Sequence, residues 1–341
     1  SFIGGNCCQQ CFNKMSYFRK FTFSTNHSDP ILSQVAHYPR IVETALLSER
    51  YSTASSLKKM NFAKGDGVLA ISDNGNFSRM SKIAKRFTSK GAALVKEAEV
   101  HQQASGKIPD ALLLQRELLL EAIIEACQKE FDKTPLTEIV GKQLLCTPDY
   151  MIGLEDFVIP VATMVGIFNP IFSPAPDRIL PFQLHTIDTY LKQKAGYYGN
   201  GEALKAVRKF LVLHSFDYAS ARQGAGAMGM DDVEGIAVSF GGPMASKEYV
   251  TGISIAGQFH QLPEKLPESY LIAVAILAGV NQGLRNKAVP IHILGLGSPI
   301  LIVLLGYLLR KSDAVSIDAT STFKDADDGN IYARDPAFLK L

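Results

Sequence analysis

Short apolar runs alternate with longer stretches of helical periodicity from about residue 60 onward. Six of the apolar runs have the length and the β-compatible residues of buried strands: residues 67–72, 149–154, 209–213, 235–238, 291–296 and 314–317. The pattern between them predicts helices over 78–87, 110–131, 269–284 and 299–310, with Asp110 as the N-cap of the second. This alternation predicts crossover connections and a parallel sheet.

A polar residue or a glycine follows each predicted strand. In a (β/α)₈ barrel the carboxyl ends of the strands meet at one mouth, where catalytic groups collect. We therefore expect an α/β fold of the TIM-barrel type, with two further strands in residues 1–60 or 157–200. A doubly wound open sheet is the alternative, although no Gly-x-Gly-x-x-Gly follows an early strand. The residues at the predicted mouth are Asp73, Glu155, Asp156, His214, Ser239, Gly241, Gly242, Gly295 and Asp318.

The length and composition fit a single large barrel. The chain has 341 residues, of which 47% are hydrophobic, and a formal net charge of +2. We expect a partly irregular N-terminal segment over residues 1–60 and the barrel over 61–341. The chain starts at Ser1, without a methionine, and ends soon after a strand-like segment, which fits a fragment truncated at its C-terminus; the alternative, a protein that does without the missing part, stays open. A charge so close to zero means that a nucleic-acid partner would need a local basic patch.

A cytoplasmic protein without membrane spans is the expected class. Residues 290–309 approach the length of a span, but Gly295, Gly297 and Pro299 interrupt them. Five cysteines and no visible signal peptide indicate reduced thiols. Cys8-x-x-Cys11 has half the spacing of a zinc site, so we expect unliganded cysteines there, with a partial metal site as the alternative.

Two carboxylates at opposite ends of the chain, Asp73 and Asp318, are candidates to share the mouth. Paired carboxylates cleave glycosidic bonds: one attacks the anomeric carbon and the other handles protons. The alternative for each aspartate is that it caps the helix that follows.

The sequence resembles the tRNA-guanine transglycosylases, the queuine and archaeosine tRNA-ribosyltransferases. "DNGNF" from Asp73 is similar to their Asp-Ser-Gly-Gly-Phe/Tyr motif, and "GIAVSFGGPMASKE" from Gly235 to their Gly-Tyr-Ala-Ile-Gly-Gly-Leu segment. "PIHILGLGSP" from Pro290 resembles Pro-Arg-Tyr-Leu-Met-Gly-Val-Gly-Thr-Pro, and "SDAVSIDATSTFKDADDG" resembles the segment that holds the nucleophile. The order agrees from about residue 65 to 332.

The resemblance implies a role for each matching residue. Asp318 would be the nucleophile and Asp73 the general acid/base. Glu155, or its neighbour Asp156, falls where the family has an aspartate that binds the base. His214 falls where the family has a glutamine that reads the base edge; the alternative is a packed core histidine. Backbone groups close to the base would come from Ser239, Gly241, Gly242 and Gly295.

Departures from the family motifs bear on the substrate and the metal. Ser-Gly-Gly is replaced by Asn74-Gly75-Asn76, and Thr-Arg after the nucleophile is replaced by "TSTFKD". The family's zinc site would lie just after residue 332, where this chain has no cysteine, so we expect no certain cofactor, and zinc only if the protein continues past Leu341. These features are closer to the branch that inserts a 7-deazaguanine base into DNA.

The sequence therefore predicts a guanine transglycosylase that acts on DNA in preference to tRNA. Its partners would be the nucleic acid and the 7-deazaguanine base, and a homodimer is left open. Two alternatives remain: a hydrolase of small nucleosides or glycosides on the same barrel, and an inactive transglycosylase-like binding subunit.

Overall fold

The structure is a computed structural model, and it describes twelve ranges of the chain. They are residues 21–26, 44–48, 53–65, 69–169, 171–172, 176–199, 201–228, 233–240, 249–255, 258–285, 289–295 and 315–318.

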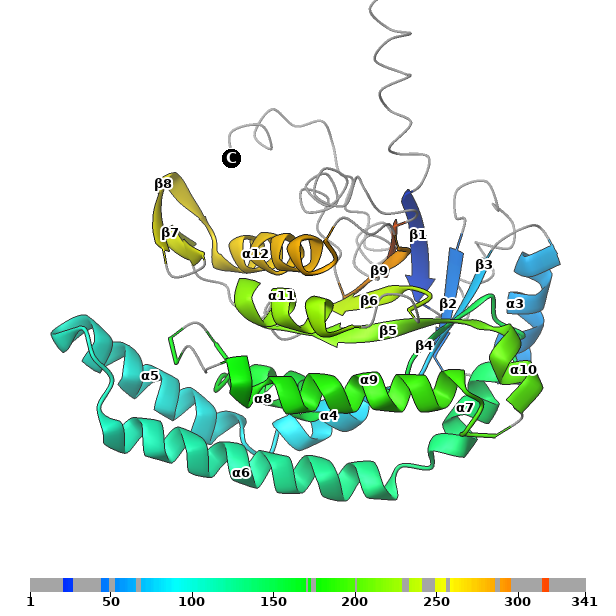
Figure 1. Cartoon of the computed structure of the whole chain (residues 1–341), viewed down its shortest axis with the longest axis horizontal. Coiled ribbons are helices and arrows are strands. Elements are labelled where there is room, and N and C mark those ends of the chain that lie inside the picture. The colour runs from blue at the N-terminus through cyan, green and yellow to red at the C-terminus, as the bar shows by residue number, and fades with distance from the viewer. Residues whose placement is uncertain are drawn as a thin grey trace, which may run out of the picture.

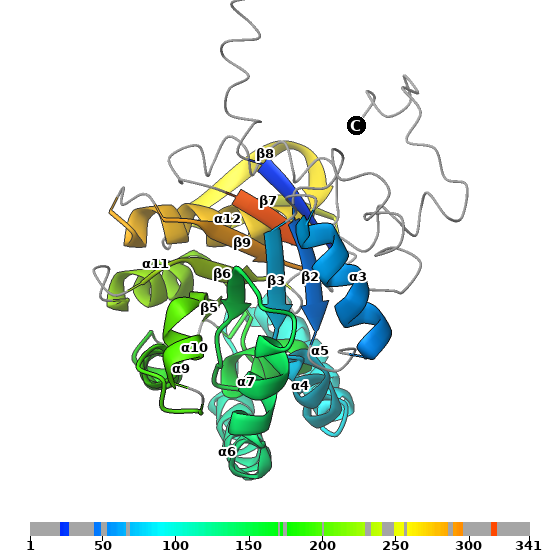
Figure 2. The ribbon, with the colours of Figure 1, turned by 90° about the vertical axis from the view of Figure 1, so that its right-hand side faces the viewer.

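The centre of the molecule is a curled, parallel sheet in an α/β fold (Figures 1 and 2). Its strands pair in the order β1-β10-β9-β6-β5-β4-β3-β2, and β1 also pairs with β2, so the pairing returns to its starting strand. The strands are β1 (Phe21–Asn26), β2 (Thr44–Ser48), β3 (Leu69–Asp73), β4 (Tyr150–Ile152), β5 (Arg208–His214), β6 (Ile236–Ser239), β9 (Ile291–Leu294) and β10 (Val315–Asp318).

All six strands predicted from the sequence are present, with ends displaced by two residues at most. The two further strands, β1 and β2, both come from the first 60 residues. The described part of residues 157–200, the other expected source, forms helices and turns. The alternation of short apolar runs with helical stretches therefore identified a parallel sheet correctly.

Helices follow β2, β3, β4, β5 and β6, and a two-stranded antiparallel hairpin precedes the last of them. The segments after β1, β9 and β10 lie outside the described ranges, as does the helix predicted over 299–310. The helices are α3 (Ala54–Gly65), α4 (Asn76–Ala84), α5 (Thr88–Ser105), α6 (Asp110–Lys133), α7 (Leu136–Leu144), α8 (Val158–Val165), η3 (Pro176–Arg178), α9 (Leu180–Lys194), α10 (Gly201–Ala206), α11 (Tyr218–Ala227) and α12 (Glu268–Gly283), and the hairpin is β7 (Tyr249–Ile255) with β8 (Gln258–Pro267).

One detail of the predicted helices is wrong. Asp110 is the first residue of α6 and not its N-cap; Pro109 holds that position, without a side-chain cap bond. Asp110 still lies in the first turn, where a carboxylate interacts favourably with the helix dipole. None of the helices in the described ranges combines the length and the apolar composition that crossing a bilayer requires.

Side chains alternate between the two faces of the curled sheet, as they must in strands. One set fills the space that the strands enclose, and it includes Leu46, Ile71, Ile152, Phe210, Val212 and Ala237. The intervening residues face outward and pack against α11 and α12; among them are Leu211, Leu213, Ile236, Val238, Ile293 and Ile317. The sheet is therefore apolar on both faces, as expected for parallel strands covered by helices.

A second core lies between α4, α5, α6 and α8. The helix α8 is apolar all round and almost completely buried at its centre. It passes close to α5, where a Cβ on Gly91 would lie 2.0 Å from the carbonyl oxygen of Val165. In Figure 1, α5 and α6 run along the lower edge of the molecule, on the opposite side from α12 and the β7–β8 hairpin.

The connection from β3 to α4 is a tight turn. Gly75 has a φ of 67°, in the left-handed region that glycine enters without steric cost, and it precedes the first residue of α4. The turn brings the end of β3 directly onto the N-terminus of α4. The residues of the "DNGNF" segment are therefore all held at the carboxyl end of the sheet.

Candidate functional site

The inward-facing series of residues becomes polar at the carboxyl ends of the strands. The apolar residues Ile71, Val212 and Ala237 face inward, and two positions further along each strand stand Asp73, His214 and Ser239. His214 is buried, whereas Asp73 and Ser239 are half-buried. Polar groups from three strands therefore line the carboxyl end of the ring, the name used here for the eight paired strands of the curled sheet.

Asp73 and Asp318 are both the last residues of their strands. Asp318 pairs in register with Ser24 of β1, and Asp73 with Ser48 of β2. The strands β1 and β2 thus separate the two aspartates in the ring. A side-chain oxygen of Asp73 accepts a hydrogen bond from the backbone N–H of Gly75, at 3.1 Å.

The predicted mouth residue Gly295 directly follows β9. It is exposed and has a φ of 74°, a conformation that favours glycine. Gly241 and Gly242 lie outside the described residues.

Glu155, Asn74 and His214 form a buried hydrogen-bonded network across the ends of β3, β4 and β5. Nε2 of His214 lies 2.9 Å from one carboxylate oxygen of Glu155, and the side-chain amide of Asn74 donates to the other at 3.2 Å. The three residues are between 1% and 8% exposed. A buried carboxylate needs partners of this kind, because burial of an unpaired charge is costly. These are also three of the positions at which the sequence departs from the transglycosylase motifs.

Asp156 points into a different environment from its neighbour. One of its oxygens accepts from the backbone N–H of Val158 at the start of α8, at 2.7 Å, and the other lies 2.7 Å from Nδ1 of His185 on α9. The hydrogen bond with Asp156 raises the pKa of His185. Of the two adjacent acids, Glu155 is therefore the one that is hydrogen-bonded to the other predicted site residue, His214.

A second polar pair lies inside the ring, below the carboxyl ends of the strands. Nδ1 of His292 on β9 is 2.7 Å from the hydroxyl of Ser316, two residues before Asp318 on β10. His292 is fully buried, and burial lowers its pKa to about 3. Its Nε2 atom has no hydrogen-bond partner within the described residues.

Asn74, His185 and His292 were not among the residues predicted from the sequence. Asn74 follows Asp73 directly, so a polar residue after a strand was a usable signal. His292 interrupts an apolar strand at an inward-facing position, which the two-residue period could also have indicated. His185 is a single histidine on a helix, and no local sequence pattern predicts its contact with Asp156.

The described residues hold no cluster of three or more His, Cys, Asp or Glu side chains that could bind a metal ion. The side chains of Cys127 and Cys146 are buried, and burial raises the pKa of the Cys127 thiol. A thiol with a raised pKa is a poor nucleophile and a poor metal ligand. Cys7, Cys8 and Cys11 lie outside the described ranges.

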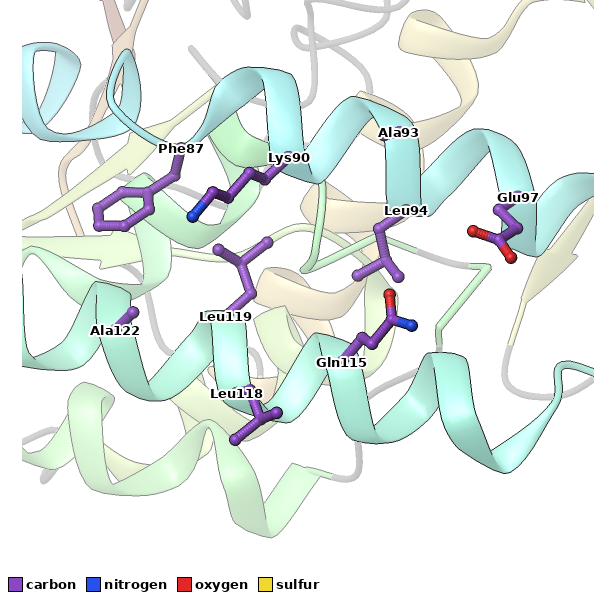
Figure 3. A pocket seen from close by; sticks show the side chains of 9 residues that line it. All are labelled: Phe87, Lys90, Ala93, Leu94, Glu97, Gln115, Leu118, Leu119 and Ala122. Atoms are coloured by element: carbon purple, nitrogen blue, oxygen red, sulfur yellow. The ribbon is translucent and has the colours of Figure 1, made fainter.

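A groove of about 460 Å³ lies away from the strand ends, between α5 and α6 (Figure 3). Leu94, Leu118 and Leu119 provide apolar surface, and its polar side chains are those of Lys90, Glu97 and Gln115. None of these groups forms a hydrogen-bonded pair of the kind that proton transfer needs. The polar strand ends are therefore the better candidate for a catalytic site.

The chain matches no model of a known protein family, no curated protein and no solved structure in the comparisons made with it. The case for a function therefore rests on the strand-end residues and on the motifs to which they belong.

Proposed function

We propose that this chain is a nucleic-acid guanine transglycosylase built on a (β/α)₈ barrel. It exchanges guanine for a 7-deazaguanine base through a covalent glycosyl-aspartate intermediate, and it acts in the cytoplasm on DNA in preference to tRNA. The observation that carries the proposal is the convergence of Asp73 with the buried Glu155–His214 pair at the carboxyl end of the parallel sheet.

The strand register supports the barrel. In the pairing from β1 through β2, β3, β4, β5, β6, β9 and β10, the partner positions can be followed strand by strand back to β1. Once round the sheet, the paired positions return to β1 displaced by eight residues. Eight strands with a shear of eight are the geometry of (β/α)₈ barrels.

The same geometry supports a shared site for the two aspartates. In a barrel of eight strands with a shear of eight, positions at the same height along the axis lie one residue further on than the paired position at each successive strand. With this shift, position 318 lies in the same layer as Leu46, Ile152 and Ala237, and Asp73 lies one layer nearer the mouth. In such barrels the inward residues of alternate strands stack in successive layers. Two carboxylate positions in adjacent layers suit a reaction that needs one attacking and one proton-transferring group.

The proposed reaction proceeds in two displacements. The Asp318 carboxylate attacks C1′ of the nucleotide, so a C1′–O bond forms as the C1′–N9 bond breaks, and the departing guanine takes up the proton that Asp73 carries at this stage. Asp73 then removes the N9 proton of the incoming base, whose nitrogen displaces Asp318 and restores the free carboxylate. The target nucleotide has to leave the stack first, at a cost of a few kcal/mol.

Glu155 suits recognition of guanine. Its oxygens have about four lone-pair sites, of which Asn74 and His214 occupy two. The remaining sites can accept from the N1–H and the exocyclic amine of guanine, two adjacent donors that adenine does not present in this pattern. His214, Ser239, Gly241, Gly242 and Gly295 would surround the same base. Exposed cations on α4, on α5 and on the turn between them, among them Lys82, Lys85, Arg86 and Lys90, are candidates to bind phosphates.

Trapping of the covalent intermediate tests the proposal. Wild-type protein quenched with denaturant during turnover should carry an attached oligonucleotide, and Asp318→Asn should carry none, because an amide is a far weaker nucleophile than a carboxylate. Asp73→Asn is the matched control: the same chemical change at the other aspartate should slow turnover about 10²–10⁴-fold but still allow the adduct.

The outcome assigns the roles and the substrate. An adduct that survives Asp318→Asn and disappears in Asp73→Asn would reverse the two roles. Guanine release without any adduct in the wild type would favour the hydrolase. Incorporation of ¹⁴C-labelled guanine into duplex DNA or into tRNA, measured side by side, decides between the two nucleic acids.

A further inference from the structure

We propose that Asn74 couples base recognition to proton transfer: it is a positioning residue that links Glu155 to Asp73. This inference rests on the proposed function and adds to it a residue with no counterpart among the roles that the sequence motifs imply.

The side chain of Asn74 uses both ends of its amide. Its nitrogen donates to the carbonyl oxygen of Gly153 at 2.7 Å and to Glu155 at 3.2 Å, and its oxygen accepts from the backbone N–H of Asn76 at 2.9 Å. Asn74 is only 1% exposed, so water does not compete for these bonds. One side chain therefore joins the end of β4 to the first residue of α4.

The same turn holds Asp73. The carboxylate of Asp73 accepts from the N–H of Gly75, and the amide of Asn74 accepts from the N–H of Asn76, so two consecutive side chains each fix the backbone two residues further on. A displacement of the Asn74 amide by Glu155 would consequently move the backbone on which Asp73 stands. A buried polar network is rigid in this way when each of its members is hydrogen-bonded, so a shift of one member moves the others.

His214 provides the contrast within the network. It hydrogen-bonds to the other oxygen of Glu155, but it belongs to β5 and forms no hydrogen bond with the described turn of residues 73–76. Loss of His214 should therefore disturb the base-reading carboxylate alone. Loss of Asn74 should disturb both that carboxylate and the position of Asp73.

Steady-state exchange of ¹⁴C-labelled guanine into nucleic acid separates the two effects. Asn74→Asp has nearly the same shape and retains an acceptor for the N–H of Asn76, but it loses both donated bonds and places a second carboxyl group beside Glu155. We expect KM for guanine to rise about tenfold, the effect of one lost charge-assisted hydrogen bond. We expect kcat to fall by up to about 10²-fold, because small displacements of a reacting group have effects of that size.

Two further variants complete the design. His214→Ala should raise KM for guanine to a similar extent and leave kcat within about threefold of wild type. Asn76→Asp is the matched control, because it makes the same chemical change two residues along the chain. The Asn76 amide oxygen accepts from Arg79 and its nitrogen has no partner among the described residues, so exchange should be unchanged.

The results can overturn the inference separately from the proposed function. An Asn74→Asp protein that changes KM alone, or an Asn76→Asp protein with the same loss of kcat, would exclude the coupling while exchange itself stands. Wild-type protein that incorporates no guanine into DNA or tRNA would overturn both. Thermal unfolding of each variant checks the fold, and Asn74→Ser, which shortens the side chain without adding charge, replaces Asn74→Asp if that protein is unfolded.

Discussion

Acidification should destabilise the protein through His292, and replacement of this residue by glutamine should remove that part of the pH dependence. His292 is fully buried inside the ring, which lowers its pKa to about 3 from an ordinary value of 6.5. The folded protein therefore keeps the imidazole neutral over a pH range in which the unfolded chain protonates it. The stability contributed by the neutral form is complete above pH 6.5 and is lost progressively as the pH falls toward 3.

The size of the effect follows from one proton. The unfolded chain binds about half a proton more than the folded protein at pH 6.5 and nearly one more at pH 5, where the free energy of unfolding falls by about 1.4 kcal/mol per pH unit. The wild type should thus lose about 2 kcal/mol more than His292→Gln between pH 7.5 and pH 5. Because His292 is fully buried, solvent screening does not reduce this figure.

Urea unfolding followed by circular dichroism at pH 7.5 and pH 5 measures the difference. Ile293→Val, on the same strand, is the control for a general loss of stability, since it should cost about 0.5–1.5 kcal/mol at both pH values. All other titrating groups are common to the three proteins and cancel in the comparison. Equal losses on acidification in wild type and His292→Gln would refute the burial argument.

Two further predictions concern packing and a second histidine. Gly279→Ala should cost about 1–3 kcal/mol in urea unfolding, because its Cβ would lie 2.4 Å from the carbonyl oxygen of Tyr218 where α12 crosses α11; Gly141→Ala on α7, with nothing within 4 Å, should be neutral or stabilising. His185→Gln should destabilise the protein at pH 5.5 and have little effect at pH 9. The bond to Asp156 raises the pKa of His185, so its contribution is present below pH 6.5 and is lost as the pH rises through the folded value.

Sequence patterns predicted the sheet because its strands are short apolar runs with distinct ends. They failed where tertiary packing decides the structure. The helix α8 is apolar on every side and so shows no helical period, although its burial between α4, α5 and α6 explains that composition. The strand β8 contains Pro263 and Pro267, which argue against a strand unless it lies at an edge, as it does in the two-stranded hairpin.

The residues of the candidate site could likewise be predicted from the sequence, whereas their contacts could not. Asp73, Glu155 and His214 could be named from sequence because each follows a predicted strand. The hydrogen-bonded network around Glu155 could not be predicted, because Asn74 bonds to Glu155 across 81 positions and His214 bonds to it across 59. Contacts at such separations depend on the strand order, which no local pattern contains. The choice between Glu155 and Asp156 needed the structure for the same reason.

The pairing of β1 with β10 gives the site an order of assembly. Phe21 and its partner Val315 are separated by almost the whole chain, so at ordinary rates of translation the first strand waits about 15–60 s for the last. During that interval the strands that end near Asp73, Glu155 and His214 can form and pair. The edges of β1 and β9 that later pair with β10 stay exposed, and they can pair with a wrong strand. Asp318 is the final residue of the last described strand, so a nascent chain lacks the proposed nucleophile until β10 has been synthesised. Under the proposed function, a chain made only as far as β9 would have the residues that bind the base but not the group that attacks the nucleotide.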